Sequence, residues 1–148
     1  MRVWSQTPAH AQRFAEEYGA RATDAESAVR GADVVVTATT ARQPVLKGAW
    51  LKPGAHVNAL GAPRPSWREL DDDVMANAIV VDSREAALKE SGDVILSEAS
   101  IYAEAGEFFA GTKASPVSET TVFKSLGLAI EDIAAAKLVL ERLSAKHG

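Results

Sequence analysis

The residues at 33–38, Asp-Val-Val-Val-Thr-Ala, form a continuous apolar run rich in β-branched side chains. Such a run is typical of a strand covered on both faces, as in a parallel sheet, because a strand with one wet face alternates apolar and polar residues. Parallel strands also need crossover connections, which are usually helices. This segment therefore favours a parallel α/β sheet.

The rest of the chain repeats this alternation of strands and helices. Further strands are predicted at 2–5, 56–60, 79–82 and 121–125. Helices are predicted over 8–18, 25–30, 83–89, 102–109 and 128–145, with a short helix after Asp71 and loop at 111–118. Thr7, Asp24 and Asp82 are the expected N-caps, and Asp82 with Glu85 resembles a capping box. The alternation predicts a doubly wound α/β sheet.

Composition excludes several classes of function. The 148 residues suit one domain, and the absence of Cys excludes disulfides, thiolate zinc and cysteine catalysis. A net charge of −4 argues against nucleic-acid binding, which needs Lys and Arg at the phosphates. The sequence has no apolar run of the roughly 18 residues that a membrane span needs, and its start is unlike a signal peptide, so we expect a cytoplasmic protein.

Candidate binding residues gather where the predicted strands end. Ligands of open α/β sheets bind beyond the carboxyl ends of the strands. That rule selects five segments rich in small and hydroxyl residues, at 5–7, 37–40, 60–63, 82–83 and 124–127. Each of them taken alone is also ordinary turn chemistry, but all five are expected at one edge of the sheet.

Other candidate groups have structural interpretations. His10, His56 and His147 are too scattered for a metal site, and none is expected. The aspartates at 71–73 suit the start of a helix, where they complement its dipole. Trp4 is interpreted as core, as is Trp67.

No glycine pair has the Gly-x-Gly spacing of a dinucleotide-binding turn. A response-regulator receiver is an alternative fold, because Asp82 and Thr37 end strands and Lys124 lies in a late strand. However, residues 5–7 lack the acidic side chains that such a domain uses to hold Mg²⁺.

Three long stretches resemble the ornithine cyclodeaminase/mu-crystallin family. They begin Asn-Ala-Leu-Gly-Ala-Pro-Arg-Pro at 58, Val-Asp-Ser-Arg-Glu-Ala-Ala-Leu at 81 and Thr-Val-Phe-Lys-Ser-Leu-Gly-Leu at 121. The resemblance covers essentially all 148 residues in order. It is greatest to the members that reduce ketimines with NADPH and also bind thyroid hormone.

The resemblance implies a Rossmann domain and a new interpretation of the first residues. Residues 2–5 resemble the second Rossmann strand, so the first strand and its glycine-rich turn would precede Met1. The chain is expected to be one partial NAD(P)-binding domain over 1–148, the truncated C-terminal half of a longer homodimeric enzyme. Helix 128–145 would pack on the absent N-terminal domain, which also carries the dimer contacts. Self-association of the isolated chain is expected from its uncovered apolar faces.

The resemblance also implies site residues. The cofactor-binding residues are expected to be Ser5, Gln6, Thr7, Thr37, Thr39, Thr40, Gly61, Ser125 and Leu126. Residues 5–7 match the segment that holds the adenosine ribose and its 2′-phosphate, whereas Ser125 and Leu126 match contacts near the nicotinamide. Glu90 matches a substrate-binding carboxylate. Because Gln6 is neutral where NADPH-using members typically carry Arg, the choice between NADPH and NADH stays open.

Pro63 departs from the family pattern. Cyclodeaminases carry a catalytic Asp at this place and the ketimine-reducing members a Ser. Proline offers no carboxylate, hydroxyl or N–H, so no catalytic residue is expected at the family's acid/base position. Imine reduction is less affected than cyclodeamination, because hydride chemistry belongs mainly to the cofactor.

Three hypotheses follow from these observations. The first is the NAD(P)H-binding half of a ketimine reductase, inactive alone, whose substrate is a cyclic ketimine. The second is a non-catalytic module that binds NADP(H) or thyroid hormone. The third is a truncated product without independent function.

Overall fold

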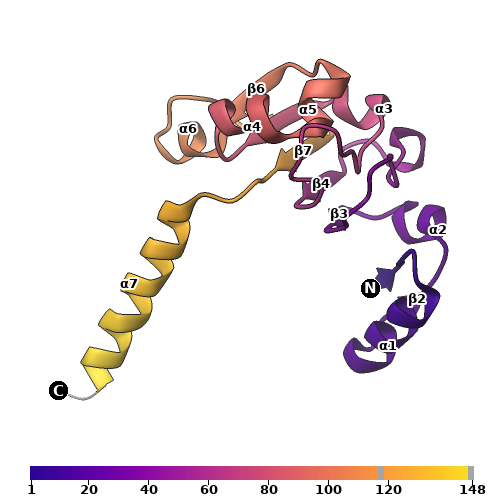
Figure 1. The fold of residues 1–148 in the computed structure, drawn as a ribbon, viewed down its shortest axis with the longest axis horizontal. Coiled ribbons are helices and arrows are strands. Elements are labelled where there is room, and N and C mark those ends of the chain that lie inside the picture. The colour runs from indigo at the N-terminus through magenta and orange to yellow at the C-terminus, as the bar shows by residue number, and fades with distance from the viewer. Residues whose placement is uncertain (117–118, 147–148) are drawn as a thin grey trace.

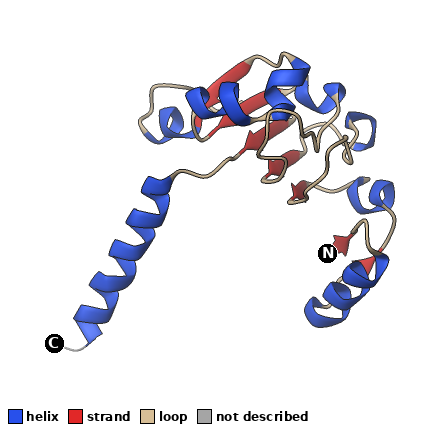
Figure 2. Cartoon of the chain, viewed as in Figure 1, coloured by secondary structure: helices blue, strands red, loops and turns tan. Residues whose placement is uncertain are grey.

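The protein is an α/β structure with two parallel sheets, described by a computed structural model over residues 1–116 and 119–146 (Figures 1 and 2). The larger sheet contains, in spatial order, β3 (Val34–Thr37), β4 (His56–Ala59), β7 (Thr121–Lys124), β5 (Ala78–Val81) and β6 (Ile101–Glu104). All four of its strand pairs are parallel. The smaller sheet pairs β1 (Arg2–Val3) with β2 (Arg21–Ala22), also in parallel. The predicted parallel α/β class is confirmed.

The N-terminal unit is a compact β-α-β-α segment. Helix α1 (Pro8–Tyr18) begins with Pro8, whose missing N–H costs nothing there, and ends at Gly19 with φ 62°. Helix α2 (Ala25–Val29) is capped by Asp24, which accepts a 2.8 Å bond from the Ser27 amide. That bond holds the pKa of Asp24 below its usual value. Strand β2, only two residues long, was not predicted.

One face of the larger sheet carries the core. Helices α3 (Asp72–Met75), α4 (Arg84–Glu90) and α5 (Gly92–Ser97) contribute to it, and the 3₁₀ turn η1 (Gly48–Trp50) packs against it. The strand residues on this face include Val57, Val81 and Val122, all fully buried. The opposite face is open at its edge, because Val34 and Val36 are 57% and 60% exposed. The prediction that β3 is covered on both faces is therefore wrong within this chain.

Two segments differ from their predicted structure. The predicted helix over 102–109 is divided into strand β6 and the short helix α6 (Ala105–Phe109), because Ile101 and Ala103 pair with β5. Helix α5 was not predicted, since it begins directly after α4 with Ser91 as the cap of both. Residues 111–116 are loop as expected, and the end of the predicted loop, 117–118, lies outside the described residues.

The last helix, α7 (Ala129–Lys146), extends away from the sheet (Figure 1). Its apolar side chains Ile133 and Leu140 are 62% and 65% exposed. No helix in the described parts of the chain is long and apolar enough to cross a membrane.

The two sheets are separated between β1 and β3. A groove of about 470 Å³ lies there, lined by Met1, Val3, Val34 and Val36 among others. In the Rossmann order 3-2-1-4-5-6, the first strand stands between the second and the fourth. If β1 is the second Rossmann strand and β3 the fourth, the interruption falls at the place of the first.

Candidate functional site

The ends of four neighbouring strands bring most of the predicted site residues to one edge. Because β3, β4, β7 and β5 are parallel neighbours, the residues that follow them lie side by side. Backbone bonds continue past the strands, from the Leu60 amide to the Thr37 carbonyl and from the Ser125 amide to the Ala59 carbonyl. The fifth predicted segment, 5–7, follows β1 of the smaller sheet.

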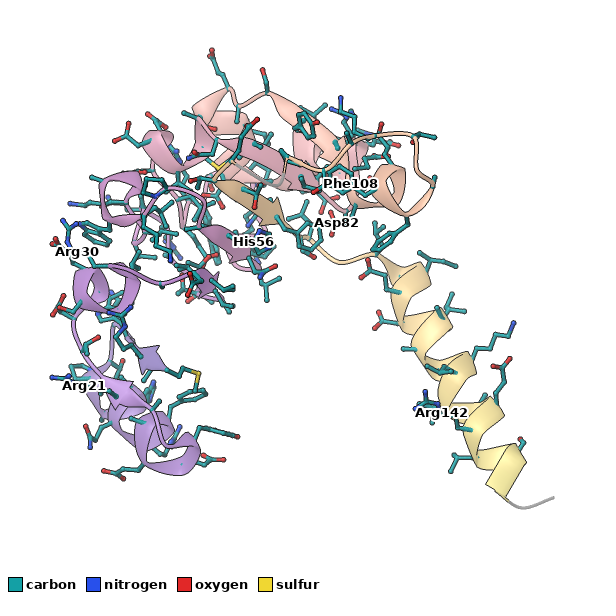
Figure 3. All side chains as sticks on the ribbon, turned by 180° about the vertical axis from the view of Figure 1, so that it is seen from behind. Arg21, Arg30, His56, Asp82, Phe108 and Arg142 are labelled. Carbon is teal, nitrogen blue, oxygen red and sulfur yellow. The ribbon has the colours of Figure 1, made fainter. Side chains whose placement is uncertain are left out.

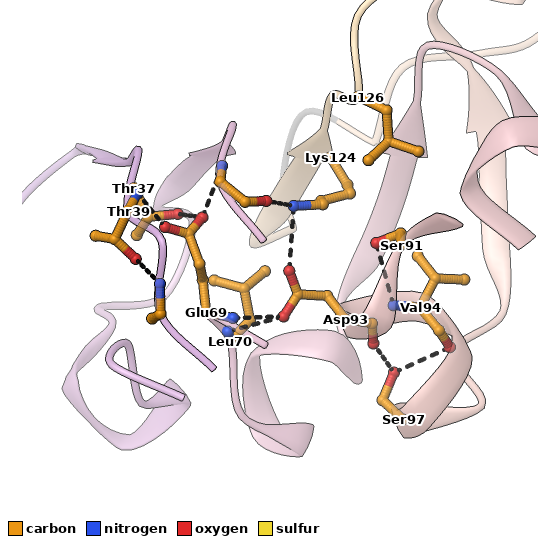
Figure 4. A network of polar contacts seen from close by, with 12 residues as sticks. Thr37, Thr39, Glu69, Leu70, Ser91, Asp93, Val94, Ser97, Lys124 and Leu126 are labelled. Atoms are coloured by element: carbon orange, nitrogen blue, oxygen red, sulfur yellow. Dashed lines mark hydrogen bonds and ion pairs between the residues drawn. The ribbon is translucent and has the colours of Figure 1, made fainter. Parts of the chain in front are cut away.

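Glu69 joins the loops after β3 and β4. Its side chain is fully buried, and it accepts hydrogen bonds from the Thr37 hydroxyl at 2.9 Å and the Gly61 amide at 2.8 Å. The Thr39 amide donates to the same carboxylate. One carboxylate thus satisfies donors from both loops and fixes their spacing (Figure 4).

A buried ion pair between Lys124 and Asp93 stabilises this arrangement. The Lys124 ammonium lies 3.2 Å from Oδ2 of Asp93, and both side chains are 0% exposed. Lys124 also donates to the Gly61 carbonyl. The other oxygen of Asp93 accepts from the backbone amides of Glu69 and Leu70 at 2.8 and 3.0 Å. Lys124 therefore contacts the loop after β4. The receiver alternative would instead require it to act on Asp82.

Asp82 organises the loop after β7. One carboxylate oxygen accepts from the Ser125 hydroxyl at 3.0 Å and from the amides of Leu126 and Gly127, each at 2.7 Å. The other accepts from the Ser83 amide at 2.8 Å. The amides of Leu126 and Gly127 are consequently bonded to Asp82, which leaves the carbonyls and side chains of this loop as the groups that could bind a ligand.

The capping box predicted at Asp82 is wrong. The N-cap of α4 is Ser83, whose hydroxyl accepts from the Ala86 amide at 3.2 Å. The carboxylate of Asp82 faces residues 125–127 instead. An acidic residue directly before a helix satisfies a capping pattern equally well, so the local sequence does not distinguish the two roles.

The turn at 61–63 is tightly constrained. A Cβ at Gly61 would overlap the Glu69 carboxylate and the Thr39 carbonyl, so only glycine fits. Ala62 has φ 50°, an uncommon value for a residue with a side chain. Pro63 is exposed and presents only its ring and carbonyl.

Glu90 comes just before a segment that contacts residues 64–67, which follow this turn. It is the last residue of α4 and is exposed. Two residues later, the Gly92 amide donates to the Arg64 carbonyl at 3.1 Å, and a Cβ at Gly92 would overlap the backbone of residues 64–67. The predicted substrate carboxylate and the predicted acid/base position are thus carried by adjoining segments.

Of the three histidines, His10 and His56 lie within the described residues and His147 lies outside them. Both ring nitrogens of His56 have partners, the Thr121 hydroxyl at 2.7 Å and the Asn58 side-chain oxygen at 3.3 Å. Within residues 1–116 and 119–146, no group of three metal-binding side chains occurs. Figure 3 labels His56, Asp82 and Phe108, which line a hollow of about 650 Å³ on the face opposite the main core.

The residues at 5–7 lie beside a separate hollow. Ser5 accepts a 3.3 Å bond from the Thr7 amide, and the Thr7 side chain makes no cap bond with α1. Gln6 is exposed and lines a hollow of about 580 Å³ together with Trp4, Thr40 and Arg42. We name it the Gln6–Arg42 hollow. The loop after β1 and the loop after β3 both line this hollow, although the two strands belong to different sheets.

Sequence reasoning did not identify Glu69 and Asp93 as site residues. Both lie within the stretches that resemble the family, but the resemblance gave neither of them a role, and a charged residue among polar neighbours predicts a solvated surface. Lys124 was noted as a strand residue, and its burial follows from the central position of β7 between β4 and β5.

Comparison with known proteins agrees with this geometry. Residues 1–147 match the sequence profile of the ornithine cyclodeaminase/mu-crystallin family. The chain is 54% identical over 148 residues to the ketimine reductase mu-crystallin of Macropus fuliginosus, covering 97% of this chain and 47% of that protein.

Solved structures show the same fold. The Δ1-pyrroline-2-carboxylate reductase of Thermococcus litoralis, in complex with NADH and L-proline, superposes with a TM-score of 0.89 at 40% identity, over 99% of this chain and 50% of that one. An archaeal alanine dehydrogenase dimer with bound NAD gives a TM-score of 0.86 at 35% identity, over 99% and 50%. The chain spans about half the length of the relatives it matches.

Proposed function

The chain belongs to the ornithine cyclodeaminase/mu-crystallin family, and we propose that it is the NAD(P)H-binding half of an imine reductase. The proposed substrate class is a small cyclic ketimine, in line with relatives named ketimine reductase and Δ1-pyrroline-2-carboxylate reductase. The observation that carries the proposal is the rigid edge formed by the loops after β3, β4 and β7. Two carboxylates, Glu69 and Asp82, accept hydrogen bonds from seven donors in these loops and in Ser83, and so fix the geometry of the edge.

The chain's own residues would bind and orient the cofactor. The Thr40 side chain is exposed at the edge, and the Thr39 hydroxyl accepts from the Ala41 amide at 3.1 Å. Leu126 is half-buried and presents an apolar surface where the nicotinamide is proposed to lie. When bound, the cofactor supplies the hydride. The protein supplies a fixed edge whose internal polar groups are already satisfied and do not compete for the ligand.

The substrate side of the proposal rests on Glu90 and Pro63. An exposed carboxylate at Glu90 suits an iminium or amine nitrogen, with which it would form a charge-assisted bond. The Pro63 side chain can neither donate nor accept a proton, so residue 63 contributes only its backbone to the site. We therefore propose reduction of a preformed imine rather than a cyclodeamination that needs a carboxylate at 63.

A complete cofactor site needs more than these residues. The 148 residues contain no Gly-x-Gly turn, which in dinucleotide-binding folds lets a helix N-terminus approach the pyrophosphate. We propose that this turn and the rest of the substrate pocket come from a complementary half. The purified chain is then expected to bind NAD(P)H weakly and to reduce no ketimine by itself.

Titration of the purified chain with NADH, followed by the fluorescence of the reduced nicotinamide, tests the binding. Saturable binding that falls at least fivefold in Gly61→Ala, but not in Gly106→Ala, supports the proposal. Gly106 is the matched control, because a Cβ there meets no atom within 4 Å. Absence of binding of both NADH and NADPH by the wild-type chain would refute it. Oxidation of NADH by the chain with Δ1-pyrroline-2-carboxylate would refute the need for a complementary half.

Pro63 also supports a second candidate, a non-catalytic module that binds NADP(H) or an apolar ligand such as thyroid hormone. The hollow near His56 and Phe108 has the size and largely apolar lining of a small-molecule site. Calorimetry with triiodothyronine distinguishes this candidate. Heat of binding that is lost in Phe108→Ser favours it, whereas no heat at saturating concentration refutes it.

A further inference from the structure

Strand β3 ends the larger sheet without the features that usually protect an edge. Natural edge strands carry charged residues, prolines or bulges, which prevent pairing with further chains. At the other edge of the sheet, β6 contains Glu104 and has a register shift against β5. Strand β3 has the sequence Val-Val-Val-Thr and a regular register with β4. It therefore has the character of an interior strand, although within the described residues no strand pairs with its other side.

The backbone groups on the unpaired side of β3 follow from its bonds to β4. The Thr37 carbonyl accepts from the amide of Leu60, directly after β4, at 2.8 Å. Successive residues of a strand direct their backbone groups to opposite sides. The N–H and C=O groups of Val34 and Val36 consequently face away from β4, where an extended chain would continue the sheet.

The groove between β1 and β3 runs along this side of β3. All of residues 34–39 line it, and because successive strand residues point to opposite faces, such a lining follows the edge of the strand. Met1, Val3 and Phe14 of the N-terminal unit line it as well, and β1 pairs only with β2 in the described parts of the chain. None of the described lining residues is charged. The groove thus suits an uncharged, extended segment that is apolar on both faces.

A separate polypeptide segment fits this groove better than a second copy of the chain does. The β3 of a second copy would bring its own β4 with it, whereas the groove already has β1 on one side and β3 on the other. The solved reductase that superposes over 99% of this chain has half of its own chain outside the match. Further polypeptide is therefore the occupant that these observations favour.

We propose that an extended, uncharged segment of another polypeptide, roughly five residues long as strands usually are, pairs with β3 and fills the space between the two sheets. This inference deepens the proposed function and rests on it for the donor, since the segment would belong to the complementary half. Main-chain hydrogen bonds supply the affinity, and the apolar lining selects against charge. Val34 and Val36, which are 57% and 60% exposed, become covered on binding.

Calorimetry with the synthetic peptide acetyl-Lys-Val-Val-Ile-Val-Ala-Lys-amide tests the inference. The wild-type chain is expected to bind this peptide. N-methylation of the three valines of the peptide removes backbone donors and is expected to weaken binding at least tenfold. Val36→Lys places a charge in the groove and is expected to have an effect of the same size. Leu88→Lys, at a residue of α4 that is 57% exposed, is the matched control and should leave the affinity within twofold.

Hydrogen exchange locates the bound peptide. Exchange at the amides of Val34 and Val36 is expected to slow at least tenfold, with β6 unchanged. No binding at saturating peptide, equal binding of the N-methylated peptide, unchanged binding by Val36→Lys, or slowing at β6 instead would each overturn the inference. Protection of Val34 and Val36 that rises with protein concentration in the absence of peptide would also overturn it, because a second copy would then occupy the edge.

Titration of the same samples with NADH and NADPH separates the inference from the proposed function. Binding of a dinucleotide without binding of the peptide supports the proposed function and refutes the inference. Binding of the peptide without binding of either dinucleotide refutes the proposed function, while the strand-binding groove itself is supported.

Discussion

The ammonium of Lys124 and the carboxylate of Asp93 form a 3.2 Å ion pair in which neither side chain is exposed. The pair lies directly beneath the turn at 61–63, because Lys124 also donates to the Gly61 carbonyl. Asp93 in turn receives the amides of Glu69 and Leu70. The conformation of the proposed cofactor edge therefore depends on charges that are nowhere in contact with solvent.

Lys124→Met is expected to destabilise the chain strongly. It leaves the Asp93 charge buried without its cation, and breaking a buried pair from one side costs about 3–5 kcal/mol. Urea unfolding followed by circular dichroism measures the loss. Lys89→Met is the control, because Lys89 pairs with Glu85 on the surface and such pairs contribute below about 1 kcal/mol. Equal midpoints for the two variants would contradict the account.

Gly61→Ala is expected to lower the free energy of unfolding by about 1–3 kcal/mol, as overpacking does. The added methyl group would overlap the Glu69 carboxylate and the Thr39 carbonyl, which form the loop contact itself. The urea midpoint checks this, with Gly106→Ala as the matched substitution in open space. A wild-type midpoint for Gly61→Ala would show that the turn is not packed as described.

Asp82→Asn is expected to loosen the loop at 125–127 locally. Three donors share one Asp82 oxygen, and hydrogen bonds to a charged group are each worth about 1.5–3 kcal/mol. Since 1.4 kcal/mol corresponds to a factor of ten, hydrogen exchange at Leu126 and Gly127 should accelerate roughly ten- to hundredfold. Asp33→Asn, which removes a carboxylate paired with Lys52 at the surface, should leave these two rates unchanged.

Helix α7 is expected to promote association of the isolated chain. Ile133 and Leu140 are more than 60% exposed, and contiguous exposed apolar surface tends to be buried between molecules. Light scattering coupled to size exclusion should give a mass above that of one chain, decreasing toward the monomer in the double variant Ile133→Glu, Leu140→Glu. A wild-type monomer at every concentration would contradict this expectation.

The strands and most helices were predictable because their signals are local. The β-branched run of β3, Pro8 at the start of α1 and Gly19 at its end each act through conformational preferences of a few adjacent residues. Strand β6 and helix α5 were missed for the opposite reason. Pairing with β5 and the double cap at Ser91 decide their structure, and neither is a local preference.

The sequence predicted that the site residues lie at one edge of the sheet. It did not predict the buried network of hydrogen bonds that holds the loops there. Residues at strand ends follow from the parallel sheet, whereas the burial of Glu69 and Asp93 depends on which loops the strand order brings together. A charged residue in a polar stretch predicts a solvated surface, and here tertiary contacts override that expectation.

Mapping NADH onto the isotopically labelled chain by amide chemical shifts tests the central claim most directly. The account predicts dose-dependent shifts at Thr39, Thr40 and residues 125–127, with α7 unchanged. Shifts confined to α7 or to the face around His56, or none at saturating NADH, would contradict the assignment of the carboxyl edge as a cofactor site.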